Sequence, residues 1–276
     1  MKIVTTTSVL PYDYPCDKAL LRLSDIGFKC LDLAMDYCAS VKDGPFASDD
    51  WERWAENLYE LAEKNGVRYT HSHAWGEASS RHLLTLRCFD VCRVLKTPYC
   101  VVHPVFKDEN KRIYDDVEEF IKVNVEAIKP LLEAAERNGV ILLSENLLWG
   151  ASIQPTAIAA LVKEVNSPYF GWCYDTGHAN AFSLSPTELL SCDVAPLSLH
   201  IQDNHGVKKD EHLLPGDGAI DWKLCLDTLK KCGYKGDVVL EAHHQSLYAP
   251  DEKRDEILVD LLGRAEKMRD YYLSLQ

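Results

Sequence analysis

The chain has 276 residues, of which 46% are hydrophobic and 26% charged, and no low-complexity tract or Pro/Gly/Ser-rich linker separates its periodic segments. This composition is typical of globular proteins, and we expect one domain over residues 1–276. The formal net charge of -13 argues against nucleic acid as a partner, because non-specific affinity for nucleic acid comes from Lys and Arg side chains that displace counterions.

The N-terminal stretch MKIVTTTSVLPYDYP has neither the apolar core nor the cleavage site of an export signal. The apolar stretches stop well short of the roughly 18 to 20 residues that a membrane span requires. We therefore expect a cytoplasmic protein without a membrane partner. The ten cysteines are scattered through apolar segments without CxxC pairs, which predicts reduced thiols in the core.

Short apolar or β-branched runs alternate along the chain with longer stretches of helical periodicity. Eight strands are predicted, at Ile3–Thr6, Cys30–Leu33, Val67–His71, Tyr99–His103, Ile141–Glu145, Phe170–Tyr174, Ser198–Ile201 and Val238–Glu241. Helices are predicted at Asp17–Ile26, Asp49–Asn65, Ser79–Leu95, Tyr114–Asn138, Pro155–Glu164, Ser185–Cys192, Trp222–Cys232 and Glu252–Leu273. The tetrapeptides DIGF, KNGV, RNGV and KCGY each place a helix-ending glycine before a strand.

Eightfold βα alternation predicts an α/β fold, a single (β/α)8 TIM barrel whose parallel sheet closes on itself. The alternative is an open doubly wound sheet. That architecture usually carries a Gly-rich phosphate loop after its first strand, and TTTSVLPYDYP has none.

Polar residues stand at the ends of the predicted strands, where the loops of such a barrel converge on one mouth. They are His71 and His73 on the third strand, His103 on the fourth, Glu145 on the fifth, Asp175 on the sixth, His200 on the seventh and Glu241 on the eighth, with His178, Asp203, Asp210 and His212 just beyond strand ends. A single His or Glu at a strand end is more often a hydrogen-bonded rim residue or half of an ion pair.

Taken together, the strand-end residues point to a function more strongly than any one of them does alone. Several carboxylates in one partly buried mouth would cost several kcal/mol or be forced to take up protons, unless something compensates their charge. A divalent ion compensates it, and carboxylates with imidazoles suit Mn2+, Co2+, Mg2+, Fe2+ or Zn2+. No Cys is expected near this site, which excludes the thiolate signature of structural zinc.

The motifs HSHA, VVHP, SEN, DTGH, HIQDN, DEHLLPGDGAIDW and VLEAH occur in an order and spacing that resemble the xylose-isomerase-like TIM-barrel superfamily of sugar isomerases and epimerases, which also includes endonuclease IV. The resemblance covers essentially the whole chain. It implies one catalytic metal ion, Mn2+ or Mg2+ before Zn2+ or Co2+, held by Glu145, Asp175, His200 and Glu241. Glu145 and Glu241 correspond to the acid/base pair of the family's ketose epimerases.

The implied activity is isomerisation or epimerisation of a sugar, a sugar phosphate or a keto-polyol. One carboxylate removes a proton beside a carbonyl, the metal stabilises the enediolate, and the other carboxylate returns a proton. The implied substrate-binding residues are His73, His103, His178, Asp203, His212 and Trp75. Trp75 would stack on the sugar ring, or alternatively close the core. A homo-oligomer is left open, with Trp51 and Trp54 as packing or subunit-contact residues.

Three alternatives stay open. An endonuclease IV-like phosphodiesterase would use more metal ions, with His73 (or His71), His103, His178, Asp210 and His212 as extra ligands. The acidic charge and the absence of a basic stretch at the strand ends beyond Lys208 and Lys209 weigh against it. Ketose epimerases carry an Arg shortly after the seventh-strand His, which HIQDNHGVKKDEH lacks, so dehydratases of keto-inositols or dehydroshikimate are a second alternative. A catalytically silent barrel that binds a sugar or a protein is the third.

Overall fold

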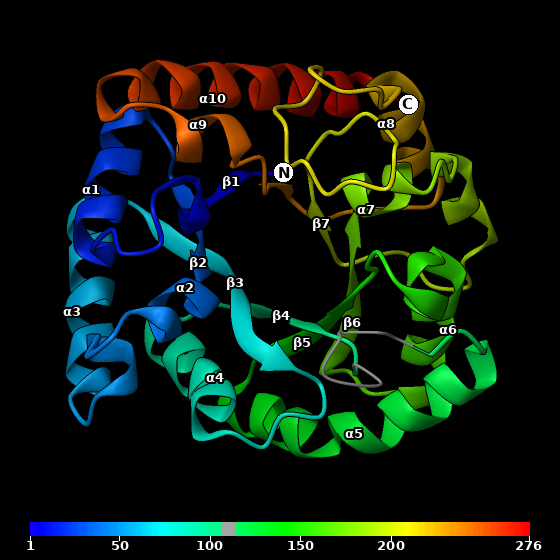
Figure 1. Cartoon of the computed structure of the whole chain (residues 1–276), viewed down its shortest axis with the longest axis horizontal. Coiled ribbons are helices and arrows are strands. Elements are labelled where there is room, and N and C mark those ends of the chain that lie inside the picture. Colours follow the sequence, from blue (N-terminus) through cyan, green and yellow to red (C-terminus); the bar gives the residue numbers. More distant parts are fainter. Residues whose placement is uncertain (106–113) are drawn as a thin grey trace.

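Eight parallel strands form the centre of the computed structural model, which describes residues 1–105 and 114–276 (Figure 1). They are β1 (Ile3–Thr6), β2 (Cys30–Ala34), β3 (Arg68–Glu77), β4 (Tyr99–His103), β5 (Ile141–Glu145), β6 (Phe170–Asp175), β7 (Ser198–His200) and β8 (Val238–Leu240). Strands that are consecutive in the sequence pair with each other, and β1 pairs with β8.

The barrel closes between β7 and β8 through one bridge, which pairs Ile201 with Leu240. The amide of Ile201 donates to the carbonyl of Val239 over 2.8 Å, and the amide of Glu241 donates to that of Ile201 over 3.0 Å. This closure confirms the predicted (β/α)8 barrel.

Long helices surround the strands on the outside of the ring, and short helices follow some of the strand ends (Figure 1). They are α1 (Cys16–Ile26), α2 (Met35–Ser40), α3 (Trp51–Lys64), α4 (Leu83–Leu95), α5 (Val117–Asn138), α6 (Pro155–Val165), α7 (Thr176–Ala181), α8 (Trp222–Lys231), α9 (His244–Tyr248) and α10 (Asp251–Ser274), with 3-10 turns η1 (Thr7–Val9), η2 (Pro45–Ala47), η3 (Gly150–Ile153) and η4 (Pro186–Ser191). Of the described helices, none is both long and apolar enough to cross a membrane.

Most predicted helices are confirmed with small shifts at their ends. The segment predicted as a helix over Ser185–Cys192 is instead the 3-10 turn η4. The helix-ending glycines Gly27, Gly66, Gly139 and Gly233 have φ values of 124°, 64°, 67° and 82°, as expected where a helix turns into a strand. In this conformation a side chain would be strained, which explains why glycine occupies each position.

Alternate residues of a strand face the same side, so the barrel interior is built in layers. An apolar layer contains two small clusters, Val4, Cys30 and Val239 in one, and Val101, Leu143 and Cys173 in the other. Two residues further along these same strands come Thr6, Asp32, Glu241, His103, Glu145 and Asp175. The strand pattern therefore places a ring of polar side chains above an apolar floor, at the C-terminal ends of the strands.

Candidate metal centre

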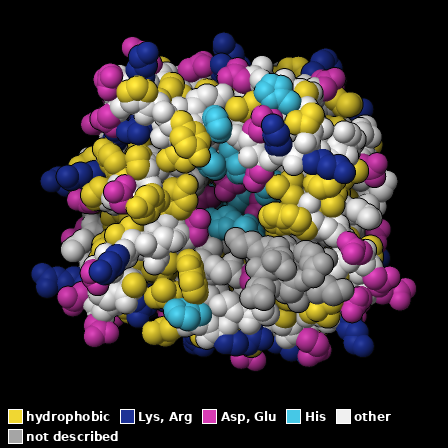
Figure 2. Space-filling model, viewed as in Figure 1, with side chains coloured by type: hydrophobic (Ala, Val, Ile, Leu, Met, Phe, Trp, Pro, Cys, Tyr) yellow, Lys and Arg dark blue, Asp and Glu magenta, His cyan; other side chains and the backbone are white. Residues whose placement is uncertain are grey.

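The polar layer opens into a cavity of about 190 Å³ at the mouth of the barrel. Figure 2 shows His and acidic side chains gathered in a hollow at the centre of this face, with hydrophobic side chains around it. The cavity is lined by Thr6, Ser8, Ala34, Asp36, Tyr37, His73, His103, Glu145, Leu147, Trp149, His178, Asp210, His212, Glu241 and His243.

A central group of four buried or nearly buried side chains, Glu145, Asp175, His200 and Glu241, has ligand atoms within 4.8 Å of one another. The Nδ1 atom of His200 lies 2.7 Å from Glu145 Oε1 and 3.3 Å from Glu241 Oε2. One oxygen of Asp175 accepts the His178 amide over 2.6 Å at the start of α7. The other oxygen is buried and has no hydrogen-bond partner within the described part of the chain.

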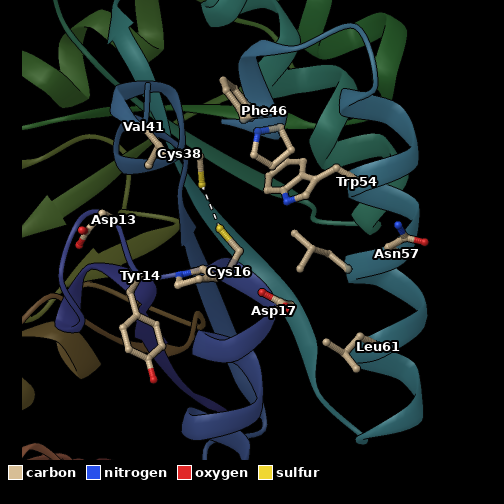
Figure 3. A pocket seen from close by; sticks show the side chains of 13 residues that line it. Asp13, Tyr14, Cys16, Asp17, Cys38, Val41, Phe46, Trp54, Asn57 and Leu61 are labelled. Carbon is tan, nitrogen blue, oxygen red and sulfur yellow. Dashed lines mark hydrogen bonds between the residues drawn. The ribbon is translucent and has the colours of Figure 1, made fainter. Parts of the chain in front are cut away.

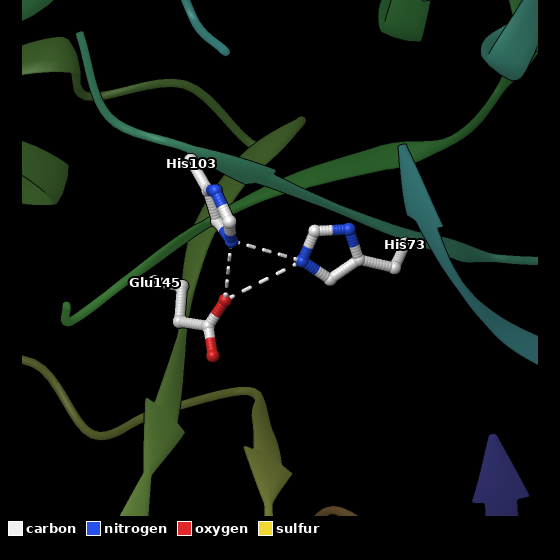
Figure 4. A group of neighbouring side chains, drawn as sticks. All are labelled: His73, His103 and Glu145. Carbon is white, nitrogen blue, oxygen red and sulfur yellow. Dashed lines mark hydrogen bonds and ion pairs between the residues drawn. The ribbon is translucent and has the colours of Figure 1, made fainter. Parts of the chain in front are cut away.

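A second group joins His73 and His103 to the same Glu145 (Figure 4). The two Nε2 atoms lie 3.1 Å apart, and they lie 3.6 and 3.5 Å from Glu145 Oε2. This oxygen is buried without a hydrogen-bond partner in the regions that the structure describes. Two imidazole nitrogens that converge on one carboxylate oxygen form the donor set that divalent transition metals prefer.

A third group lies on the other side of the mouth and contains His178, Asp210 and His212. The Nε2 atom of His178 lies 3.4 Å from Asp210 Oδ2, and that of His212 lies 3.0 Å from Asp210 Oδ1. Two of these residues come from the segment after β7, and His178 belongs to α7.

Hydrogen bonds to the backbone fix the orientation of three of these imidazoles. The pairs of Nδ1 and carbonyl oxygen are His73 with Ala74 (3.1 Å), His178 with Asn146 (2.8 Å) and His212 with Glu241 (2.8 Å). With Nδ1 carrying the proton, each Nε2 presents a lone pair to its ligand group. Metal-ligating histidines are oriented in this way in proteins, so these residues fit a metal centre.

His200 is turned the other way, because its Nδ1 atom faces the carboxylates. Its Nε2 atom lies 4.0 Å from Asp32 Oδ2 on β2. Asp32 is fully buried, and neither of its oxygens has a hydrogen-bond partner among the described residues. Asp32 was not anticipated from the sequence, although an Asp within the apolar run CLDLA was a signal for it.

The mouth contains buried acidic groups whose negative charge is only partly offset by neighbouring positive charge. Burial raises the pKa of both Asp32 and Asp175 to about 7. Burial alone would lower the pKa of His73 and His212, but the neighbouring carboxylates of Glu145 and Asp210, respectively, favour the protonated imidazoles and raise both pKa values to about 9. Burial would raise the pKa of Glu145, yet the charge of His200 and the neighbouring imidazoles hold it well below its usual range.

One expectation about the surroundings was wrong, because a cysteine does lie beside the site. Cys173 faces into the barrel on β6 and interacts through its thiol with His200. Burial raises the pKa of this thiol to about 12, so it is neutral rather than a thiolate. It belongs to none of the three ligand groups.

Three residues expected at the site lie elsewhere. Trp75 packs against His82, with ring centroids 4.7 Å apart, and does not line the mouth cavity, whereas Trp149 does. His71 is buried below the mouth and stacks on Tyr99, so His73 and not His71 joins the second ligand group.

Asp203 is the third of these residues, because it is buried and fixes the loop that follows β7. Its carboxylate accepts hydrogen bonds from the Asn204, Gly216 and Ile220 amides and from the Trp222 indole, over 2.8–3.2 Å. A Cβ atom on Gly218 would meet Asp203 Oδ1 at 2.2 Å. The motif DEHLLPGDGAIDW is therefore a loop wrapped around one carboxylate, and this loop carries Asp210 and His212 into the mouth.

A similar close approach explains the glycine of DTGH. A Cβ atom on Gly177 would lie 2.1 Å from the side chain of Gln202, which hydrogen-bonds both Asp175 and Asp210.

The mouth also contains residues that the sequence did not single out, namely Asp36, Tyr37 and His243. The ring of His243 stacks on His212 with centroids 4.1 Å apart.

Basic residues after the strand ends are not limited to Lys208 and Lys209. Lys107, Lys111 and Arg112 follow the fourth strand in the sequence. These three residues lie outside the described part of the chain.

Comparison with known proteins gives one family match and several relatives. The family model described as xylose isomerase-like TIM barrel matches residues 20–263. The uncharacterized protein MJ1311 of Methanocaldococcus jannaschii is 32% identical over 154 residues, which are 53% of this chain and 51% of that protein. Inosose isomerase of Bacillus licheniformis is 29% identical over 167 residues, 58% of this chain and 59% of that protein. The matches thus span about half to three-fifths of these curated relatives.

Solved structures share the fold over the whole chain. A D-tagatose 3-epimerase-like protein superposes with a TM-score of 0.70 at 22% identity, covering 97% of this chain and 99% of that one. IOLI protein with a bound zinc atom superposes with a TM-score of 0.75 at 18% identity, covering 100% of both chains.

Proposed function

Because this chain belongs to the xylose isomerase-like TIM-barrel family, we propose that it is a divalent-metal-dependent isomerase or epimerase of a small carbohydrate or keto-polyol. The observation that carries the proposal is the position of Glu145 and Glu241. Both line the mouth cavity, and both contact the same nitrogen of His200. A protein that only binds a sugar has no need of two ionisable carboxylates at one point.

The two glutamates are suited to move a proton. Burial would raise the pKa of each, but the charge of His200 lowers both, which leaves them ionised and able to accept a proton. One glutamate removes the proton beside a substrate carbonyl, and the other delivers a proton to the neighbouring atom or to the opposite face. A bound divalent ion would supply positive charge for the oxygen that becomes negative when the proton leaves. His73, His103 and His178 line the same cavity and would orient substrate hydroxyls.

The relatives support this choice of substrate class. One sequence relative is an inosose isomerase, and one structural neighbour is described as D-tagatose 3-epimerase-like. The cavity of about 190 Å³ is smaller than the roughly 300–1,000 Å³ typical of drug-sized ligands, and suits a compact polar molecule. The donor set of three carboxylates and one imidazole favours Mn2+ or Mg2+, and the zinc atom of the IOLI structure makes Zn2+ an alternative.

A second candidate function rests on the two flanking ligand groups. Together with the central group they offer places for three metal ions, and Glu145 is shared between two of them. A cluster of this kind suits a phosphodiesterase, in which several ions hold the attacking and leaving oxygens. The net charge of -13 argues against a DNA substrate, so we rank this function second.

The test is a panel of ketoses, sugar phosphates and keto-inositols incubated with Mn2+-loaded protein in D2O and followed by NMR. We expect deuterium at one C–H position of the substrate, because the abstracted proton exchanges with solvent on the carboxylate. Loss of water without reversible exchange would indicate a dehydratase. Cleavage of duplex DNA at an abasic site, with three ions per chain by elemental analysis, would replace the isomerase with the phosphodiesterase.

A further inference from the structure

A second cavity, of about 550 Å³, lies on the outer wall of the barrel between α1, η2 and α3 (Figure 3). Its wall is mostly apolar, with Phe46, Trp54, Leu58 and Leu61 on one side. Two cysteines, Cys16 and Cys38, stand at the cavity and point toward one another in Figure 3. It shares no lining residue with the mouth cavity.

The two cysteines form a close pair. Their sulfur atoms lie 3.4 Å apart, although 22 positions separate them in the sequence. Cys16 is the first residue of α1 and is partly exposed, whereas Cys38 is buried in α2. The thiol of Cys38 also lies 3.4 Å from the carbonyl oxygen of Ala34.

The environment makes the two thiols chemically unequal. The hydrogen bond with Cys38 lowers the pKa of Cys16, and the same bond with burial raises the pKa of Cys38 well above its usual range. Pro15 precedes α1 and its side chain provides no cap, so Cys16 is the first residue at a helix N-terminus, whose partial positive charge favours a thiolate. Cys16 is therefore the nucleophile of the pair, and Cys38 keeps its proton.

We propose that Cys16 and Cys38 are a reversible redox modification site whose oxidant is an organic hydroperoxide with an apolar body. The Cys16 thiolate attacks the outer peroxide oxygen, the O–O bond breaks, and the alkoxide leaves as an alcohol after taking a proton from solvent. Cys16 is then a sulfenic acid. The Cys38 sulfur attacks the Cys16 sulfur, the S–O bond breaks, and hydroxide leaves as water with the Cys38 proton. The two thiols lose two electrons, and the peroxide gains them.

The apolar cavity decides the class of oxidant. Phe46, Trp54 and Leu61 offer a surface for an alkyl or aryl group beside the Cys16 sulfur. The other partly exposed cysteines are Cys192 and Cys232, and burial raises the pKa of both, to about 12 for Cys192. They are less reactive thiols and serve as internal controls.

The experiment treats reduced, full-length protein with substoichiometric cumene hydroperoxide at neutral pH and follows intact mass and a non-reducing peptide map. We expect a loss of about 2 Da, as one disulfide requires, on the peptide pair that contains Cys16 and Cys38, before any change at Cys192 or Cys232. Cumene hydroperoxide should react at least about tenfold faster than hydrogen peroxide, because its ring is buried against the cavity wall. A reducing agent should restore the original mass.

Variants separate the two steps. Cys38→Ser should stop at the sulfenic acid, which dimedone traps on Cys16, and Cys16→Ser should give neither product. Cys192→Ser is the matched control and should behave as the unchanged protein. Should a variant misfold, alkylation of the unchanged protein by iodoacetamide provides the same answer, with Cys16 modified first. Earlier oxidation or alkylation of Cys192 or Cys232, or equal rates with the two peroxides, would overturn the proposal.

Discussion

At the residue scale, Glu145 differs from the other candidate ligands because its two carboxylate oxygens face different ligand groups. Oε1 contacts His200 of the central group, and Oε2 faces His73 and His103. Among the groups that the described residues form, Glu241 belongs to the central group alone, and its Oε2 atom lies 3.9 Å from His212 Nδ1. Changes at these two residues should therefore have different consequences for metal content.

The first prediction concerns Glu145→Gln and Glu241→Gln. Each amide keeps the shape of the side chain and an oxygen ligand but cannot accept the proton, so turnover should fall by about 100 to 10,000-fold. Metal content, measured by elemental analysis, should fall further in Glu145→Gln. The exposed Glu164→Gln is the matched control. A Glu241→Gln protein with full metal content and normal turnover would leave Glu241 as a ligand alone.

The second prediction concerns Asp32, which lies 4.0 Å from His200 Nε2 and which we expect to accept the Nε2 proton once Nδ1 of His200 binds a metal ion. Asp32→Leu should weaken Mn2+ binding by about 10 to 100-fold, as loss of a partner behind a metal-ligating histidine does. The same change should raise the stability of the metal-free protein, because it removes a buried carboxylate without partners. Asp32→Asn still offers an oxygen and should lose less affinity. Unchanged Mn2+ affinity in Asp32→Leu, measured by electron paramagnetic resonance titration, would contradict this role.

At the scale of elements, the loop between β7 and α8 depends on Asp203. Asp203→Ala would leave three amides and the Trp222 indole without their acceptor, each at a cost of about 1–3 kcal/mol if it stays buried. We expect a lower melting temperature and rapid tryptic cleavage at Lys208 or Lys209. Because this loop carries Asp210 and His212, any metal at the third group should be lost first.

The control for this loop is Asp221→Ala. Asp221 caps α8 by accepting the Leu224 amide over 2.9 Å, a contact typically worth about 1 kcal/mol. This variant should be mildly destabilised without new cleavage at Lys208. Equal cleavage of the two variants would mean that Asp203 does not fix the loop.

The strands and the longer helices could be predicted from the sequence, and the shortest helices could not. The bounds of β1, β4 and β5 agree with the prediction, because turn signals and helices enclose each apolar run. The helices α2, α7 and α9 have six residues or fewer, too few to show a helical period. α2 and α7 follow a strand directly, and α9 begins at His244 shortly after β8 ends at Leu240, so the sequence of each is typical of a strand-end loop.

The residues of the candidate site that lie at strand ends could be predicted from the sequence. Position along the strands was enough to expect that the strand-end His, Asp and Glu residues meet in one mouth. The family resemblance singled out Glu145, Asp175, His200 and Glu241 among them, and the structure brings the ligand atoms of these four within 4.8 Å. The environment of Asp203 was not predictable, because its partners come from a loop that folds back over 13 to 19 residues. Asp32 was missed because its relation to His200 exists only once β2 and β7 face each other inside the barrel.

At the scale of the whole molecule, a rise in pH should destabilise the metal-free protein and increase the stabilisation that a bound metal ion provides. His73 and His212 have pKa values of about 9, above the ordinary 6.5, so their contribution to stability is complete below pH 6.5 and is lost as pH rises through 9. Burial raises the pKa of Asp32 and Asp175 from 3.8 to about 7, so these two groups lower the stability of the metal-free protein as pH rises from 3.8 to about 7, and their contribution changes little above that value.

We therefore predict that the melting temperature of EDTA-treated protein falls between pH 6.5 and 9. The gain in melting temperature on adding Mn2+ should grow over the same range, because the ion competes with fewer protons. Differential scanning fluorimetry of both forms measures this. A metal-free melting temperature that rises across this range would contradict the assignment of these protons.

The bridge between Ile201 and Leu240 gives the metal centre a mechanical role in the barrel. β7 pairs with β6 over three residues but with β8 through this bridge, and His200 and Glu241 lie on its two sides. An ion bound by both side chains would link β7 to β8, the pair of neighbouring strands with the fewest backbone contacts. Amide hydrogen exchange at Ile201 and Glu241 should then slow on addition of Mn2+, while exchange at Val4 in β1 should change little. The cofactor would thus be part of what keeps the sheet a closed cylinder.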